Sequence, residues 1–228
     1  MDFFARAIED YYSGKIKSKF IFYRHCLQKE FNGIKSEIDL GYYFRTWDKF
    51  DPLERKLIDL SYGNILDIGS CTGYYFPYLL GKGTPTGIEI SSILNNIAKK
   101  RGISNCITGN IFTYKFKRKF DTITLIGNDI ALTGTLHRLK KLLKKLSELL
   151  NKNGQVLLII RQVRTLKYWH VVFTAQYNGL ISIPFKLLFL NVKFFVKFSL
   201  KFGFRASILS KDESTGSLFY LERLVKST

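Results

Sequence analysis

The chain has 228 residues, of which 46% are hydrophobic and 15% aromatic, and it carries a net charge of +18. This length suits one well-buried domain with an appendage and argues against two full domains. Three scattered cysteines without C-x-x-C spacing argue against a disulfide framework and a zinc knuckle, so no metal site is predicted. No apolar stretch reaches the roughly 18 to 20 uncharged residues of a membrane span, and the N-terminus lacks the lysines of a secretory signal. We therefore predict a cytoplasmic protein.

The positive charge is concentrated in the second half of the chain. Lysine plus arginine exceeds aspartate plus glutamate by 1 over residues 1–60, by 2 over 61–110, by 7 over 111–160 and by 8 over 161–228. Such a field attracts RNA, DNA, acidic lipid surfaces or anionic substrates. Lysines that only solvate the surface account for the same excess, so a nucleic-acid partner stays an open alternative.

The N-terminal segment, residues 1–56, is predicted to form a helical, aromatic cap. Residues 1–35 are expected to be helical, because apolar side chains from Phe3 to Tyr12 recur at three-and-four spacing, and the run from Phe20 to Phe31 continues the pattern. Residues 36–51 are crowded with aromatic side chains and show no clear period. We interpret them as a lid across a ligand site, with plain core packing as the alternative.

The stretch from Asn64 to Tyr78 has the order strand, tight turn, helix. Ile65 to Ile68 form a short apolar run typical of a strand buried on both faces of a parallel sheet. Gly69 and Gly73 then provide the backbone freedom of a tight turn. This order places unpaired N–H groups beside a pocket at the carboxyl end of a strand, which is the geometry of a nucleotide site.

The following residues repeat the alternation of strand and helix. Strands are predicted over residues 84–90, 105–108, 122–126 and 156–160, and helices over residues 91–101 and 135–150. The second strand carries Glu89, 16 residues beyond Gly73, close to the interval of about 20 at which an acid binds ribose hydroxyls in dinucleotide folds. These alternations predict a doubly wound α/β sheet in a domain that spans residues 57–228.

After residue 160 the pattern is looser. Residues 185–190 are predicted as a strand or edge segment, and residues 191–202 as a helix with Lys193, Lys197 and Lys201 on one ridge. A membrane-surface role fits this helix, but packing against the sheet explains its apolar side with fewer assumptions. Residues 208–209 and 218–224 are predicted to close the sheet as a hairpin. The expected fold is thus a mostly parallel seven-stranded sheet with an N-terminal helical cap.

The geometry alone permits NAD, FAD, a mononucleotide or S-adenosylmethionine. A dinucleotide fingerprint requires G-x-G-x-x-G, whereas Gly69 and Gly73 are followed by aromatic residues. A phosphate loop of the G-x-x-x-x-G-K-[ST] type is also missing from the sequence.

Four segments in the correct order resemble the class I S-adenosylmethionine-dependent methyltransferases. Residues 66–73, Leu-Asp-Ile-Gly-Ser-Cys-Thr-Gly, resemble the L-D-x-G-x-G-x-G signature, and residues 87–91, Gly-Ile-Glu-Ile-Ser, resemble the second strand of that family. Residues 121–128 and 149–156 are similar to its fourth strand and to the approach to its fifth strand. Residues 43–55 and the loop at 127–134 are similar to segments of a small, largely uncharacterised subgroup. The resemblance implies a Rossmann-like methyltransferase fold that binds S-adenosyl-L-methionine.

The resemblance also implies roles for individual residues. The turn would cradle the methionine part of the cofactor, Asp67 would fix the loop or the cofactor amino group, and Glu89 would hold the ribose hydroxyls. Ile90 would pack on adenine, and Asn128 would face the methionine end and the acceptor. The complete predicted cofactor site is Asp67, Gly69, Ser70, Cys71, Gly73, Glu89, Ile90, Asn110, Ile111 and Asn128. Cys71 stands where the family has a glycine, and Asn110 where it usually has an acid, so both weaken the expected site.

The reaction that the resemblance implies is methyl transfer to a small or medium-sized acceptor. The expected acceptor site comprises Tyr42, Tyr43, Trp47 and Arg161, and the candidate catalytic residues are Asp129 and His170, which would serve if the acceptor were a hydroxyl. The alternatives are methylation of RNA or another polyanion, drawn by the basic half, and a non-catalytic binding module of methyltransferase fold. The oligomeric state is left open.

Overall fold

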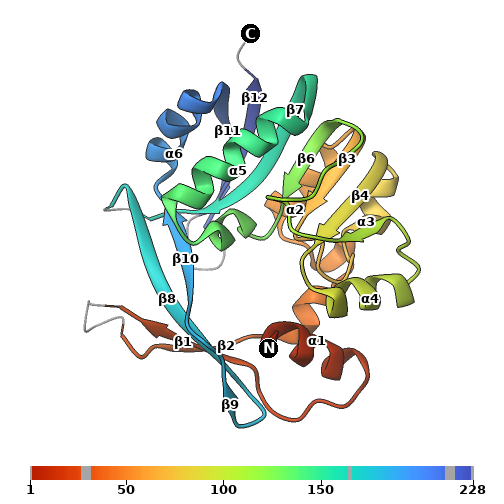
Figure 1. Cartoon of the computed structure of the whole chain (residues 1–228), viewed down its shortest axis with the longest axis vertical. Coiled ribbons are helices and arrows are strands. Elements are labelled where there is room, and N and C mark those ends of the chain that lie inside the picture. Colours follow the sequence, from red (N-terminus) through yellow and green to blue (C-terminus); the bar gives the residue numbers. More distant parts are fainter. Residues whose placement is uncertain (1, 27–31, 164–165, 214–218, 227–228) are drawn as a thin grey trace.

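The main sheet has seven strands in the predicted doubly wound arrangement. A computed structural model describes residues 2–26, 32–163, 166–213 and 219–226. Its strands follow the order β11-β12-β7-β6-β3-β4-β5. Neighbours are parallel from β7 to β5, and the antiparallel β11–β12 hairpin closes the edge beside β7, as predicted (Figure 1). The strands are β3 (Gly63–Ile68), β4 (Gly83–Glu89), β5 (Cys106–Thr108), β6 (Phe120–Leu125), β7 (Leu150–Arg161), β11 (Phe204–Asp212) and β12 (Phe219–Lys226).

Both faces of the main sheet are covered by helices. On one face, Leu66, Ile123 and Leu158 pack in a core with α5 (Leu136–Leu149) and α6 (Val192–Ser199). On the other face, Ile65 and Leu157 pack with α1 (Phe3–Tyr12), α2 (Pro52–Asp59) and α4 (Ser92–Lys100). Neighbouring strand residues point to opposite faces, so runs that are apolar throughout are buried on both sides. The remaining α-helix, α3 (Phe76–Leu80), follows the glycine turn.

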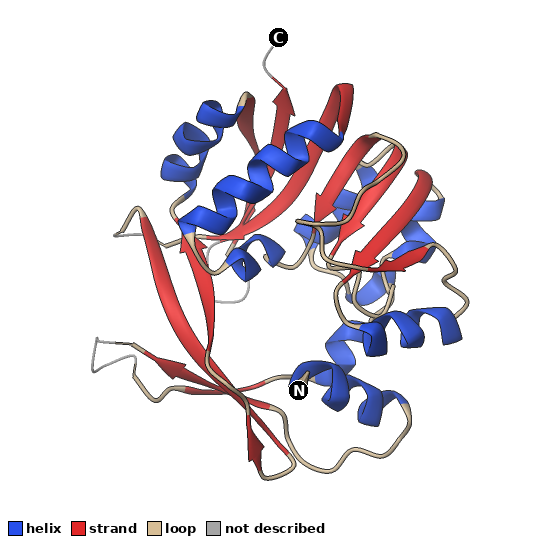
Figure 2. Ribbon diagram, in the orientation of Figure 1, coloured by secondary structure: helices blue, strands red, loops and turns tan. Residues whose placement is uncertain are grey.

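A second, antiparallel sheet faces the carboxyl ends of the parallel strands (Figures 1 and 2). Its order is β10-β8-β1-β2, with β9 paired to β8. The strands are β1 (Ile21–His25), β2 (Lys35–Glu37), β8 (Tyr168–Tyr177), β9 (Leu180–Ile181) and β10 (Phe185–Leu190). The predicted cap is therefore built from two segments far apart in the chain. The boundary at residue 56 stays a prediction.

The expectation that helix continues from Phe20 through the N-terminal cap is wrong where the structure describes it. Residues 21–25 form β1, and residues 27–31 lie outside the described residues. Phe20 and Phe22 have the two-residue period of a strand, and Phe22 packs against Phe173 and Phe185 of the second sheet. The pairing of β1 with β8, about 150 residues later, decides the conformation.

The aromatic segment after β2 forms two short 3-10 helices, η2 (Leu40–Phe44) and η3 (Trp47–Lys49), that link the second sheet to the main domain. Phe50 packs against Tyr75 and Tyr78 of the segment that follows the glycine turn. Among the described residues, no helix is both long and apolar enough to cross a membrane.

Candidate functional site

The turn after β3 is held in the left-handed region of backbone conformation. Gly69, Cys71 and Gly73 have φ angles of 78°, 50° and 72°. The N–H of Gly69 donates to the Ile88 carbonyl oxygen of β4 at 2.9 Å, and the N–H of Gly73 donates to the Ser70 carbonyl oxygen at 2.8 Å. Cys71 thus adopts a conformation that favours glycine, which is costly for an L-residue but tolerated singly. The predicted turn exists despite the missing middle glycine.

Glu89 joins this turn to the start of α4. One carboxylate oxygen accepts the N–H of Cys71 at 3.1 Å, and the other accepts the N–H of Ser91 at 2.8 Å. The lack of a side chain at Gly87 lets β4 lie close to the turn, since a Cβ there would be 2.6 Å from the Ser70 hydroxyl oxygen. The acid predicted at the end of the second strand is therefore fixed in orientation by the backbone on both sides.

Three buried carboxyl groups, those of Asp67, Glu89 and Asp129, belong to or adjoin the turn. Asp67 accepts the Thr124 hydroxyl at 2.7 Å through one oxygen, while its other oxygen is buried without a hydrogen-bond partner among the described residues. A Cβ on Gly69 would lie 3.1 Å from a carboxylate oxygen of Asp129. None of Asp67, Glu89 and Asp129 forms an ion pair with any residue that the structure describes.

Burial raises the pKa values of two of these carboxyl groups, Asp67 and Asp129. Burial raises the pKa of Asp67 to about 6, although the Thr124 hydrogen bond lowers it and Glu89 adds to the rise. Burial also raises the pKa of Asp129 well above its usual value, with Asp67, Glu89 and Glu54 contributing repulsion. Buried acids without cations favour a ligand that brings positive charge of its own.

A cavity of about 550 Å³ opens over this turn and is called the turn cavity below. It brings together eight of the predicted residues, namely Gly69, Cys71, Glu89, Ile90, Asn128, Asp129, Tyr42 and Tyr43. Asp67, at the end of β3, and Ser70 and Gly73, in the turn, are not among the described residues that line the cavity. Phe22 and Phe185 of the second sheet, together with Phe20 directly before β1, also line it; the sequence reasoning missed these three. The alternation of Phe20 and Phe22 was the available signal, but their position over the turn depends on pairing with β8.

Four further predicted residues, Asn110, Ile111, Trp47 and His170, make contacts elsewhere in the described structure. Asn110 accepts the N–H of Phe112 at 3.0 Å, and Ile111 packs against the core under α5. The ring of Trp47 packs against that of Tyr78 in a tilted arrangement, with 5.4 Å between the ring centroids. One ring nitrogen of His170 lies 3.0 Å from the Gly134 carbonyl oxygen. None of these four is among the described residues that line the turn cavity or its neighbour.

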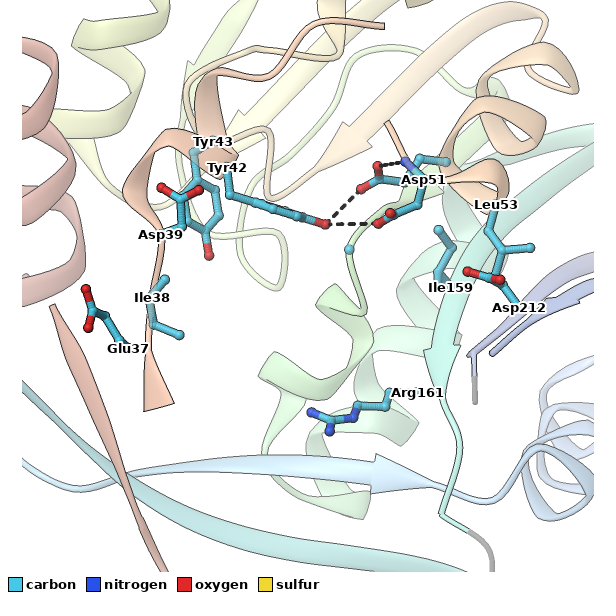
Figure 3. A pocket seen from close by; sticks show the side chains of 12 residues that line it. Glu37, Ile38, Asp39, Tyr42, Tyr43, Asp51, Leu53, Ile159, Arg161 and Asp212 are labelled. Atoms are coloured by element: carbon cyan, nitrogen blue, oxygen red, sulfur yellow. Dashed lines mark hydrogen bonds between the residues drawn. The ribbon is translucent and has the colours of Figure 1, made fainter. Parts of the chain in front are cut away.

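A second cavity of about 570 Å³, called the acidic cavity below, adjoins the turn cavity and shares Tyr42, Tyr43 and Gly127 with it. Figure 3 shows the Tyr42 hydroxyl directed at Asp51 and the Arg161 guanidinium on the opposite side. The backbone N–H of Arg161 donates to the Asn128 side-chain oxygen at 2.9 Å. Asn128, at φ 70°, therefore couples the loop after β6 to the end of β7, where both cavities meet.

Comparison with known proteins agrees with this geometry. Residues 66–158 match the family model described as a methyltransferase domain. A S-adenosylmethionine-dependent methyltransferase from Bacteroides fragilis, solved with S-adenosyl-L-homocysteine, is 24% identical with a TM-score of 0.85, covering 100% of this chain and 95% of that one. An amino pentose methyltransferase from Micromonospora echinaspora is 13% identical with a TM-score of 0.56, covering 78% and 92%.

A sugar N-methyltransferase from Streptoalloteichus is 12% identical with a TM-score of 0.59, covering 84% of this chain and 94% of that one. At these identities the solved structures establish the fold. No curated protein matches the chain.

Proposed function

We propose that the chain, whose residues 66–158 match a methyltransferase domain, is a class I S-adenosylmethionine-dependent methyltransferase that methylates a small or medium-sized acceptor held under the second sheet. The observation that carries this proposal is the turn cavity, where Gly69, Glu89 and Asn128 meet the aromatic residues of the cap. When bound there, S-adenosylmethionine supplies an electrophilic methyl group on a sulfonium.

The residues present fit this cofactor. Its α-ammonium and sulfonium bring the positive charge that Asp67, Glu89 and Asp129 lack among the described residues. We assign the ammonium to the unpartnered oxygen of Asp67, the ribose hydroxyls to Glu89, and the adenine face to Ile90, which is 69% exposed at the cavity wall. Asn128 would orient the methionine end beside the acceptor.

A small acceptor is favoured over a polyanion by where the basic residues lie. Lysines of α5 and α6, among them Lys140, Lys144 and Lys197, are exposed on the helical layer. No described lysine lines the turn cavity or the acidic cavity. The amino pentose and sugar N-methyltransferases are also named for small acceptors.

Titration calorimetry of the folded protein with S-adenosylhomocysteine tests the cofactor assignment. We expect a one-to-one complex with a dissociation constant in the micromolar range, or about −8 kcal/mol. A protein that shows a cooperative thermal transition yet releases no heat with either S-adenosylhomocysteine or S-adenosylmethionine would exclude the proposed function.

Cofactor affinity is expected to rise with pH. An Asp67 that titrates at about pH 6 in the free protein must lose its proton before it pairs with an ammonium, so binding releases a proton below that pH. The dissociation constant of S-adenosylhomocysteine should be about tenfold larger at pH 5 than at pH 7.5, since each pH unit below the pKa of Asp67 lowers the affinity by a factor of about ten. Calorimetry across this range checks the slope, and Asp67→Asn should flatten it. An unchanged slope in Asp67→Asn would assign the proton to Asp129 or Glu89.

A further inference from the structure

The acidic cavity has the opposite charge to the rest of the protein. Five of its described lining residues are carboxylic acids, Glu37, Asp39, Asp51, Glu54 and Asp212, and one, Arg161, is basic. The whole chain contains 36 lysines and arginines against 18 aspartates and glutamates. The five acids come from segments that are separate in sequence, so folding brings them together. We propose that the methyl acceptor is an amine, protonated in solution, and that this cavity recognises it; the inference rests on the proposed function.

Neighbouring cations pair with some of these carboxylates. Lys19 pairs with Glu37 at 2.7 Å, and Arg45 pairs with Glu54 at 2.9 Å and approaches Asp51 at 3.8 Å. Among the residues that line the cavity itself, carboxylates outnumber guanidinium groups by five to one. A phosphate or carboxylate acceptor would enter against this charge, whereas an ammonium group would be attracted.

The aromatic wall of the cavity supplies a second, independent observation. The Arg45 guanidinium carbon lies 3.3 Å from the centroid of the Tyr42 ring, so this ring already binds a cation on one face. The ring of Tyr43 extends into the cavity in Figure 3. Its hydroxyl makes no hydrogen bond to any described residue. Tyr43 therefore offers a free polar atom at the boundary with the turn cavity, which it also lines.

The position and size of the cavity suit an acceptor. Because the two cavities share Tyr42, Tyr43 and Gly127, a molecule in the acidic cavity lies next to the site of the methyl group. A volume of about 570 Å³ lies within the range of roughly 300 to 1,000 Å³ that is typical of small-molecule sites. A folded polymer would not fit inside it.

The chemistry of transfer to an amine is compatible with this surrounding. The ammonium first loses a proton, which restores the nitrogen lone pair. The nitrogen then forms a bond to the methyl carbon as the carbon–sulfur bond breaks, and that electron pair stays on sulfur. The product is a methylated ammonium, so one proton is released overall. Asp129 lines the turn cavity beside Tyr43 and is the carboxylate placed to accept it. Carboxylates stabilise the positive charge that develops on nitrogen.

Three molecules of matched shape test the charge preference, namely tyramine, tyrosol and 4-hydroxyphenylacetate, which carry a cationic, neutral and anionic end. Ligand-observed NMR titration is done on protein saturated with S-adenosylhomocysteine and repeated without it. We expect tyramine to bind at least about tenfold more tightly than tyrosol, with the anion weakest. Equal binding of tyramine and tyrosol, or tighter binding of the anion, would overturn the inference.

Variants connect that preference to the cavity. The double variant Glu37→Gln, Asp39→Asn should lower tyramine affinity at least threefold and leave tyrosol unchanged, while Glu148→Gln on the exposed face of α5 serves as the matched control. An anion that binds and is lost in Arg161→Met would identify an acidic acceptor instead. The titration with S-adenosylhomocysteine itself separates the two hypotheses, because failure there rejects the cofactor site, whereas the three-molecule comparison still reports the charge preference of the cavity.

Discussion

Replacement of Glu89 by alanine is expected to weaken binding of S-adenosylhomocysteine by at least about 100-fold. We assign to this carboxylate two charge-assisted hydrogen bonds to ribose, each of which is worth about 1.5–3 kcal/mol. The same side chain accepts the backbone N–H groups of Cys71 and Ser91, so its removal also frees the turn that shapes the cofactor site. Calorimetry at pH 7.5 measures the loss, and methyl transfer should fall with it at subsaturating cofactor.

Two further variants separate recognition from folding. Glu89→Gln retains one carbonyl acceptor and the side-chain volume, so its affinity should lie between those of the wild type and Glu89→Ala. Glu148→Ala removes an exposed acid of α5 and should bind as the wild type does. If Glu89→Ala kept its cooperative thermal transition and bound S-adenosylhomocysteine within threefold of wild type, Glu89 would not contact the cofactor.

The main sheet could be predicted because its signals are local. Ile65 to Ile68 and Val156 to Ile160 are apolar without interruption, and buried parallel strands require this pattern whatever lies elsewhere in the chain. Gly69 directly follows the first of these strands and marks the turn in the sequence itself. The second sheet has no such local signal. The strand at Ile21–His25 is specified by a partner about 150 residues away, and long-range pairing overrides local periodicity.

The same distinction applies to the site. The turn and Glu89 were predictable, since each follows a predicted strand directly. The acidic cavity was not, because Glu37 and Asp39 belong to one sheet and its following turn, Asp51 and Glu54 to the start of α2, and Asp212 to the end of β11. The cofactor roles that the resemblance implies for Asn110 and Ile111 stay predictions; in the structure Asn110 accepts the N–H of Phe112, and Ile111 packs against the core.

Replacement of Glu54 by leucine is expected to reduce the free energy of unfolding by about 3–5 kcal/mol, the cost of leaving one partner of a buried ion pair uncompensated. Glu54 is 2% exposed and accepts two hydrogen bonds from Arg45, at 2.9 and 3.1 Å, one from the Tyr75 hydroxyl and one from the Asp51 N–H. Chemical denaturation monitored by circular dichroism measures the effect.

An exposed ion pair of α2, between Asp59 and Lys82, serves as the control. Asp59 pairs with Lys82 at 2.8 Å, nearly the Glu54–Arg45 distance, but the two side chains are 55% and 34% exposed. Solvent screens such a pair, so Asp59→Ala should cost less than about 1 kcal/mol. Burial, and not distance, would then account for the difference. Equal losses in the two variants would contradict this.

The Glu54 variant also tests the link between stability and the two cavities. Arg45 donates to the carbonyl oxygens of Tyr42 and Lys49 at 3.0 Å each. The Arg45–Glu54 ion pair therefore holds the segment that carries Tyr42 and Tyr43 against α2. A second substitution, Arg45→Met, removes the uncompensated charge and should recover part of the lost stability. This second substitution does not restore the contacts that hold the segment with Tyr42 and Tyr43 against α2. The double variant should therefore unfold at a higher denaturant concentration than Glu54→Leu. It should bind tyramine no better, because recognition depends on where Arg45 holds Tyr42 and Tyr43.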